Sequence, residues 1–174
     1  MQNLHWTIPP ILEGTHVTLE PLQPHHGDDL LAAAADGELW NLWYTSVPNT
    51  ETIRGYMARA MADREAGTAM PFLVRDAAGE PVGSTRFFRM DPVVPSLEIG
   101  YTWYSARVQR TALNTEAKRL LLAHAFETLD CIAVEFRTHF FNHQSRRGIE
   151  RLGAKLDGVL RSHQINRHPD AHGA

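Results

Sequence analysis

The 174-residue sequence contains one cysteine, Cys131, which excludes an internal disulfide framework. Its N-terminus lacks the basic segment and the long apolar stretch of a signal peptide. No apolar run approaches the roughly 18 residues that a membrane span requires. The formal net charge is −3, which argues against a general nucleic-acid binder. These absences predict a cytoplasmic protein that binds neither nucleic acid nor a membrane.

A hydrophobic content of 43% suits one globular domain spanning residues 1–174. The charge is uneven along the chain. Residues 1–92 carry 6 basic and 12 acidic groups, whereas residues 93–174 carry 11 basic and 8 acidic groups. Of the 17 basic residues 15 are arginine, whose planar guanidinium suits phosphate. An anion site is therefore expected in the second half.

Hydrophobic periodicity and turn residues predict alternating strands and helices. The expected strands are 15–22, 72–76, 81–90, 96–104, 132–139 and 155–164. The expected helices are 24–35, one from 49 or 50 to 67, one from about 114 to 129, and 143–152. The strands from 72 to 104 follow one another closely and so predict an antiparallel meander.

The segment from Leu97 to Gly153 is the most informative. A strand leads into a turn that carries Arg107, Gln109 and Arg110, and a helix follows. The first N–H groups of a helix lack intrahelical partners and the helix dipole is positive there, so anions bind at such ends. The turn is therefore a candidate phosphate site. The arginines of the last helix, Arg146, Arg147 and Arg151, have the alternative of simply solvating a helix face.

Four stretches resemble the GNAT acetyltransferase superfamily, and within it the ribosomal-protein N-terminal acetyltransferase-like subgroup. They are residues 14–22 (GTHVTLEPL), 98–103 (EIGYTW), 114–126 (NTEAKRLLLAHAF) and 142–153 (NHQSRRGIERLG). The order of the expected elements is similar as well, over nearly the whole chain. The resemblance implies an α/β (α+β) fold with a mixed, mostly antiparallel central sheet flanked by helices.

The resemblance also implies acetyl-CoA as cosubstrate. In the superfamily the pantetheine arm pairs with a free strand edge, which corresponds here to Ile99, Gly100, Tyr101 and Trp103. The phosphates bind at the turn before the long helix, which corresponds to Arg107, Gln109, Arg110, Thr111, Ala112 and Asn114. Ala112 and Asn114 occupy positions where the family usually has glycine. Asn142 and Arg147 of the last helix complete the implied cofactor site.

Amine acetylation needs a base for the ammonium proton and donors for the carbonyl oxygen. Glu98 is the candidate base, acting directly or through water, although a strand glutamate also has the alternative of facing solvent. By resemblance, Ser145 is the acid that reprotonates the thiolate. The alternative is that Asn142 merely caps the helix with Ser145 at its third position. Trp43, in the segment where the family has its acceptor loop, has the alternative of packing in the core.

The function expected is acetyl transfer from acetyl-CoA to a primary amine by direct attack, with a protein N-terminus as favoured acceptor. The alternatives are a small amine or amino acid as acceptor, or an idle acyl-CoA-binding protein. No metal is expected, because His163, His168 and His172 lack the spacing of a compact ligand motif.

Related enzymes have one more strand after the segment 155–164, inserted between the two preceding strands. This sequence lacks a segment for it, so two strand edges would stay unpaired, at about 1–3 kcal/mol per buried group. A homodimer that supplies the missing pairing is therefore expected. The other explanation is that the chain is a shortened product.

Overall fold

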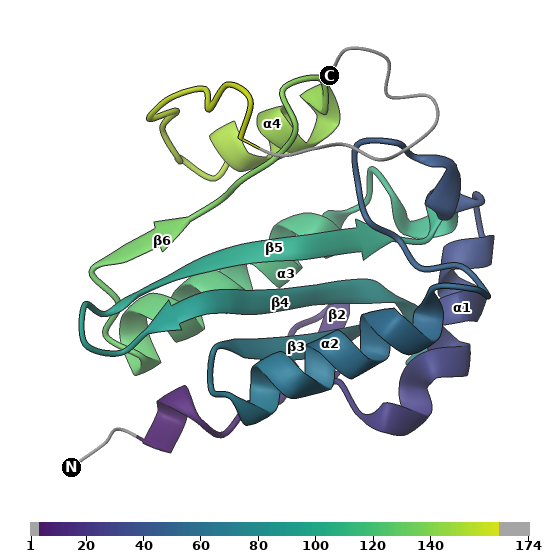
Figure 1. Ribbon diagram of the computed structural model, residues 1–174, viewed down its shortest axis with the longest axis horizontal. Coiled ribbons are helices and arrows are strands. Elements are labelled where there is room, and N and C mark those ends of the chain that lie inside the picture. Colours follow the sequence, from purple (N-terminus) through teal and green to yellow (C-terminus); the bar gives the residue numbers. More distant parts are fainter. Residues whose placement is uncertain (1–3, 164–174) are drawn as a thin grey trace.

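The computed structural model describes residues 4–163, whose elements are labelled in Figure 1. Within this range one sheet has the strand order β1-β2-β3-β4-β5-β6. All neighbouring strands are antiparallel except β5 and β6, which are parallel. The strands are β1 Leu12–Glu13, β2 Val17–Pro21, β3 Ala69–Asp76, β4 Pro81–Asp91, β5 Ser96–Tyr104 and β6 Ala133–Glu135. The predicted mixed, mostly antiparallel sheet is confirmed.

Helices cover both faces of this sheet. The α-helices are α1 Gly27–Ala35, α2 Ile53–Glu65, α3 Ala112–Ala123 and α4 His143–Glu150. The shorter helical turns are η1 Leu4–Trp6, η2 Pro24–His26, η3 Leu39–Asn41, η4 Ala106–Val108 and the π-helical η5 His124–Thr128, which extends α3. Figure 1 shows α2 in front of the sheet, α3 behind it and α4 beyond β6.

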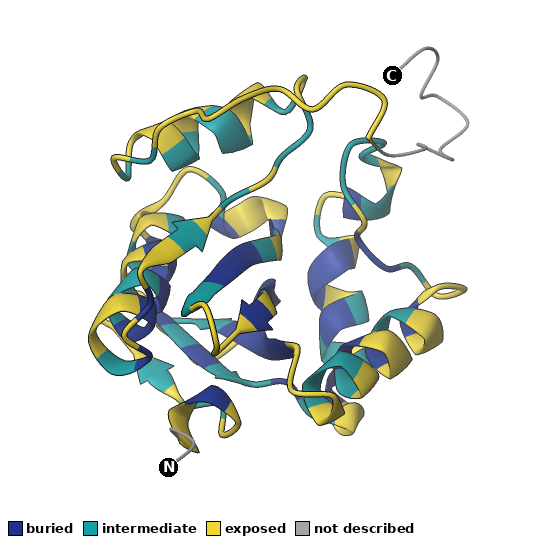
Figure 2. Ribbon diagram, turned by 60° about the vertical axis from the view of Figure 1, so that its left-hand side comes forward, coloured by how far each residue is buried: buried dark blue, intermediate teal, exposed yellow. Residues whose placement is uncertain are grey.

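Two apolar clusters hold these layers together. On the α3 side, the helix buries Leu113, Ala117, Leu121 and Ala125, which are the residues that the periodicity predicted, with Leu120 partly buried. On the other face, Met57 and Ala60 of α2 pack in a cluster with Leu73 and Trp103 of the sheet. A fully buried leucine contributes about 1.5–3 kcal/mol. The sheet is therefore buried between two helical layers (Figure 2).

The C-terminal part departs from the sequence predictions. The strand expected over 132–139 is only three residues long, because pairing with β5 stops at Glu135. The strand expected over 155–164 is wrong for residues 155–163, which form no strand and are exposed, while residue 164 lies outside the described range. A strand needs a neighbouring edge to bond with, and local sequence cannot report whether one is available.

Candidate active site

The site is built around the point where β5 and β6 separate. Ser96, Leu97 and Glu98 pair with Ala133, Val134 and Glu135, and β6 then ends. Beyond Glu98, β5 continues to Tyr104 with β4 on one side and no strand on the other among the described residues. Figure 1 shows the chain after β6 leaving β5 toward α4. A free strand edge presents unpaired N–H and C=O groups, so Ile99–Trp103 can bind an extended ligand.

A bulge interrupts this free edge. Gly100 pairs with Arg86 and Trp103 with Ser84, so two residues of β5, Tyr101 and Thr102, lie opposite one residue of β4. Tyr101 adopts a φ of 50°, which is uncommon for a non-glycine residue. A bulge leaves one residue out of the ladder and re-aims its neighbours. The backbone at Tyr101 is therefore free to face a ligand.

Packing against a buried arginine fixes the Tyr101 side chain. The guanidinium of Arg86, which is 1% exposed, lies 4.0 Å from the centroid of the Tyr101 ring and 5.1 Å from that of Tyr56. The Phe88 ring meets Tyr101 edge-on, with 5.1 Å between centroids. Trp103 is buried and its indole N–H donates to the Tyr56 hydroxyl at 3.4 Å. Of the four residues implied along this edge, Tyr101 is the exposed one and Trp103 belongs to the core.

Glu98 is buried, and does not face solvent as an isolated strand glutamate usually does. Its Oε2 lies 3.4 Å from Arg137 Nε and 3.7 Å from Arg89 Nη1, and it accepts no hydrogen bond from the described residues. Burial raises the pKa of the Glu98 carboxyl, and Arg137 and Arg89 oppose that shift. The carboxyl lines a cavity of about 180 Å³ together with both arginines and Glu135. A carboxylate with an unbonded oxygen at a cavity can accept a proton.

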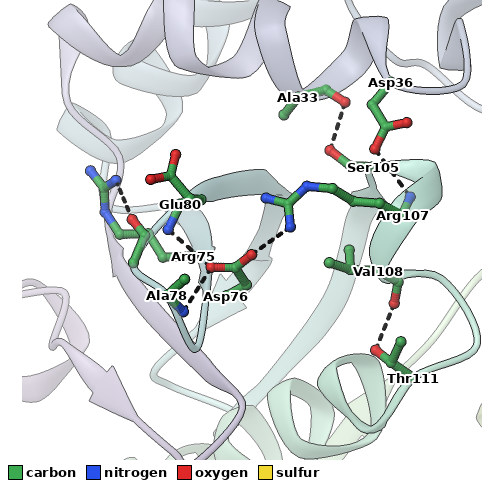
Figure 3. A network of polar contacts seen from close by, with 11 residues as sticks. Ala33, Asp36, Arg75, Asp76, Ala78, Glu80, Ser105, Arg107, Val108 and Thr111 are labelled. Atoms are coloured by element: carbon green, nitrogen blue, oxygen red, sulfur yellow. Dashed lines mark hydrogen bonds and ion pairs between the residues drawn. The ribbon is translucent and has the colours of Figure 1, made fainter.

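Arg107 is engaged in an ion pair. Its Nη1 donates to Asp76 Oδ2 at 2.6 Å, and its backbone N–H donates to Asp36 (Figure 3). Burial alone would raise the pKa of Asp76, but hydrogen bonds from Arg107 and two backbone N–H groups hold it below its usual value. The arginine lines a cavity of about 210 Å³ beside α1 whose other charged residues are acidic. A phosphate would have to compete with Asp76 for Arg107.

The turn that follows places other predicted residues at the start of α3. Thr111 caps the helix, since its Oγ1 accepts the N–H of Leu113 at 3.3 Å. The helix therefore begins at Ala112, two residues before the predicted start at Asn114. Arg110 precedes the cap, is exposed, and has a φ of 62°. The Gln109 side-chain amide donates to the Tyr104 carbonyl at 2.9 Å and so ties the turn to β5.

The start of α4 shows the capping arrangement. Asn142 Oδ1 accepts the N–H of Ser145 at 3.0 Å, while the Ser145 hydroxyl makes no hydrogen bond with the described residues. Arg147 is exposed. The helix lies against the first turn of α3, where Arg151 Nη2 donates to Thr115 Oγ1 at 3.0 Å. The structure thus brings α4 to the predicted phosphate turn.

Sequence reasoning did not single out Lys118. This α3 residue is 7% exposed, and its Nζ donates to Thr102 Oγ1 at 3.0 Å and lies 5.2 Å from the centroid of the Phe136 ring. Burial lowers the pKa of the Lys118 ammonium to about 7. The available signal was its position one helical turn after Asn114, beside the apolar stripe of α3.

Comparison with known proteins follows the geometry. A sequence profile described as acetyltransferase (GNAT) domain matches residues 16–155. A GCN5-related N-acetyltransferase from Brucella melitensis is 30% identical with a TM-score of 0.79, over 92% of this chain and 74% of that one. An acetyltransferase from T. thermophilus, so far assigned only by similarity, is 31% identical with a TM-score of 0.76, over 91% and 82%.

A third similar structure is the RimL ribosomal L7/L12 α-N-protein acetyltransferase in complex with coenzyme A. It is 18% identical with a TM-score of 0.78, over 91% of each chain, and this likeness concerns the fold alone. No curated protein matches the sequence. Residues 4–163 include no helix long and apolar enough to cross a membrane, and no group of three or more side chains that could hold a metal ion. His168 and His172 lie outside this range.

Proposed function

The chain belongs to the acetyltransferase (GNAT) domain family, and from that premise we propose that it acetylates the amino group at a protein N-terminus. The family makes it an N-acetyltransferase that uses acetyl-CoA. The observation that carries the proposed mechanism is Glu98, a buried carboxylate with an unbonded oxygen at a cavity, placed where β5 loses its partner strand.

The proposed cofactor position uses the free edge of β5 and the start of α3. The pantetheine arm would pair with the backbone of Ile99–Trp103, and the phosphates would bind at the turn from Gln109 to Ala112, with Arg110 beside them. The N–H groups of the first turn of α3 support this placement, because they have no intrahelical partner. Asn114, Asn142 and Arg147 are the remaining proposed cofactor residues.

In the proposed reaction Glu98 takes a proton from the acceptor ammonium, directly or through one water. The neutral amine attacks the thioester carbonyl carbon, the C–N bond forms, and the C–S bond breaks. The bulge at Tyr101 supports a role for backbone N–H groups as donors to the carbonyl oxygen while it carries negative charge. Ser145, whose hydroxyl is unbonded, is proposed to give its proton to the departing thiolate.

Two exposed arginines support a peptide acceptor. Arg89 and Arg137 line the cavity of Glu98 and have side chains 55% and 37% exposed. Guanidinium groups in these positions can donate to the carbonyl and carboxylate oxygens of a peptide's first residues. The coenzyme A complex of a protein N-terminal acetyltransferase with the same fold adds support.

Thiol release from acetyl-CoA tests this proposal. The panel should hold peptides with a free N-terminal Ser or Ala, the same peptides with a blocked N-terminus, free amino acids and small diamines. We expect turnover with the free peptides and none with the blocked ones. Turnover confined to free amino acids or diamines would favour the small-amine alternative. Coenzyme A binding without thiol release across the panel would favour the idle-binder alternative.

We also propose a cytoplasmic homodimer. The single cysteine is free and buried, which suits a reducing compartment. The outer edge of β6 has no strand partner among the described residues, and the neighbouring Ile132 is 73% exposed. A second chain that pairs with this edge would cover both.

A further inference from the structure

Lys118 is the one buried ammonium in the described part of the chain, and its environment leaves it incompletely bonded. An ammonium has three N–H donors, but Thr102 Oγ1 is the only hydrogen-bond acceptor that the described residues offer it. No carboxylate of residues 4–163 lies within 4.0 Å of its Nζ. Burying a charged group without a partner is unfavourable, so a bound acceptor at this position would stabilise it.

The position of Lys118 places those free donors at the separation of β5 and β6. Thr102 belongs to the bulge on the free edge of β5, and Phe136 directly follows the end of β6. The Nζ contacts both, at 3.0 Å from Thr102 Oγ1 and 5.2 Å from the Phe136 ring centroid. The ammonium thus lies between the two diverging segments, on the α3 side of the sheet.

The neighbouring polar groups hold the ammonium in place. Thr102 Oγ1 lies 2.8 Å from Thr85 Oγ1, so the Thr102 hydroxyl can accept from Lys118 while it donates to Thr85. Phe136 supplies a ring face for a cation–π contact, which adds about 0.5–1 kcal/mol or more. This arrangement fixes the direction of the amine and uses one of its three donors.

We propose that Lys118 is a cofactor-positioning residue whose ammonium donates a hydrogen bond to a carbonyl oxygen of the pantetheine arm of acetyl-CoA. The arm carries two amide carbonyls and a thioester carbonyl, which are acceptors of the kind that the free donors need. An extended chain on the edge of β5 passes the Lys118 amine at Thr102. This inference rests on the proposed binding of the arm along β5.

The test compares two ligands that differ in the arm. Coenzyme A carries it, and adenosine 3′,5′-bisphosphate lacks it. Calorimetric titration of both ligands should use the full chain, Lys118→Met, which keeps the length and loses the donors, and Lys118→Gln, which keeps a neutral donor. Lys155→Met is the matched control, because Lys155 is the chain's other lysine and is exposed.

We expect Lys118→Met to weaken coenzyme A binding by about 10- to 100-fold, the range for a hydrogen bond from a charged group. Binding of the bisphosphate should stay within about twofold, Lys118→Gln should fall between, and Lys155→Met should match the wild type. Wild-type coenzyme A affinity in Lys118→Met, or equal weakening of both ligands, would overturn the inference alone. A wild-type chain that binds neither ligand would overturn the proposed function as well.

Discussion

At the scale of single residues, Glu98 shows how burial converts an ordinary strand carboxylate into a candidate base. Desolvation raises the pKa of its side chain, while Arg137 and Arg89 keep the charged form accessible. The base must be deprotonated, so the rate should rise with pH through a pKa above the ordinary value of 4.5. Both the raised pKa and the unbonded Oε2 follow from the position of Glu98 at the last paired residue of β5.

We predict that Glu98→Gln lowers turnover about 10²-fold and removes the rise of rate with pH, while coenzyme A affinity is retained. Glu135→Gln is the matched control, since Glu135 lines the same cavity but is exposed, and it should keep the wild-type profile. Ser145→Ala should also lower turnover more than affinity. A pH–rate profile of Glu98→Gln that matches the wild type would return Glu98 to a structural role.

The two arginines of the turn before α3 should contribute unequally to phosphate binding. Arg110 is exposed beside the helix cap, whereas the Arg107 guanidinium is held by Asp76. We predict that Arg110→Glu weakens coenzyme A binding about tenfold or more and that Arg107→Glu weakens it less. Calorimetry on each variant and on the double variant measures this. An unchanged affinity in the double variant would show that the phosphates bind elsewhere.

At the scale of elements, α4 carries a glycine in its interior that its packing does not require. A Cβ at Gly148 would meet the Asn114 Nδ2 at 3.8 Å, an ordinary contact. We predict that Gly148→Ala raises the free energy of unfolding by about 0.5–1 kcal/mol through helix propensity. Gly153, just after the helix, has a φ of 90°, so Gly153→Ala should lower it by about 1 kcal/mol.

Chemical denaturation measures both variants. Opposite signs at Gly148 and Gly153 are the expected result, because one glycine lies inside α4 and the other lies just after it in a different backbone conformation. A loss of stability in Gly148→Ala would mean that α4 packs more closely on α3 than the contact at Asn114 indicates.

At the scale of the whole molecule, the unpaired strand edges favour association. Ile132, Phe140 and Phe141 are exposed around β6 and before α4, at 73%, 49% and 52%. We predict a homodimer at micromolar concentration, with a mass twice the 19.6 kDa of one chain by sedimentation. Ile132→Asp should shift the equilibrium toward monomer, because it adds a charge where an apolar residue would be covered. A well-folded monomeric wild type that binds coenzyme A would contradict the dimer.

Prediction from sequence succeeded where the signal is local. The apolar stripe of α3 and the bounds of β5 follow from periodicity, and these segments keep the same partners along their whole length. The start of α3 was misplaced by two residues because Thr111 and Asn114 both have side chains suited to capping. The strand expected over 155–164 was wrong because its alternation of residue types meets no neighbouring edge within the described range.

The sequence by itself determined the order of the elements, the basic turn before α3 and the presence of Glu98 and Ser145, since these depend on residue type and spacing. Tertiary structure decided which of the two turn arginines stays available, because Asp76 is 31 positions away from Arg107 along the chain. It likewise decided that Glu98 is buried between two arginines and that Lys118 contacts Thr102. Pairings between distant segments set burial and charge environment, and a residue's own neighbours in sequence carry no record of them.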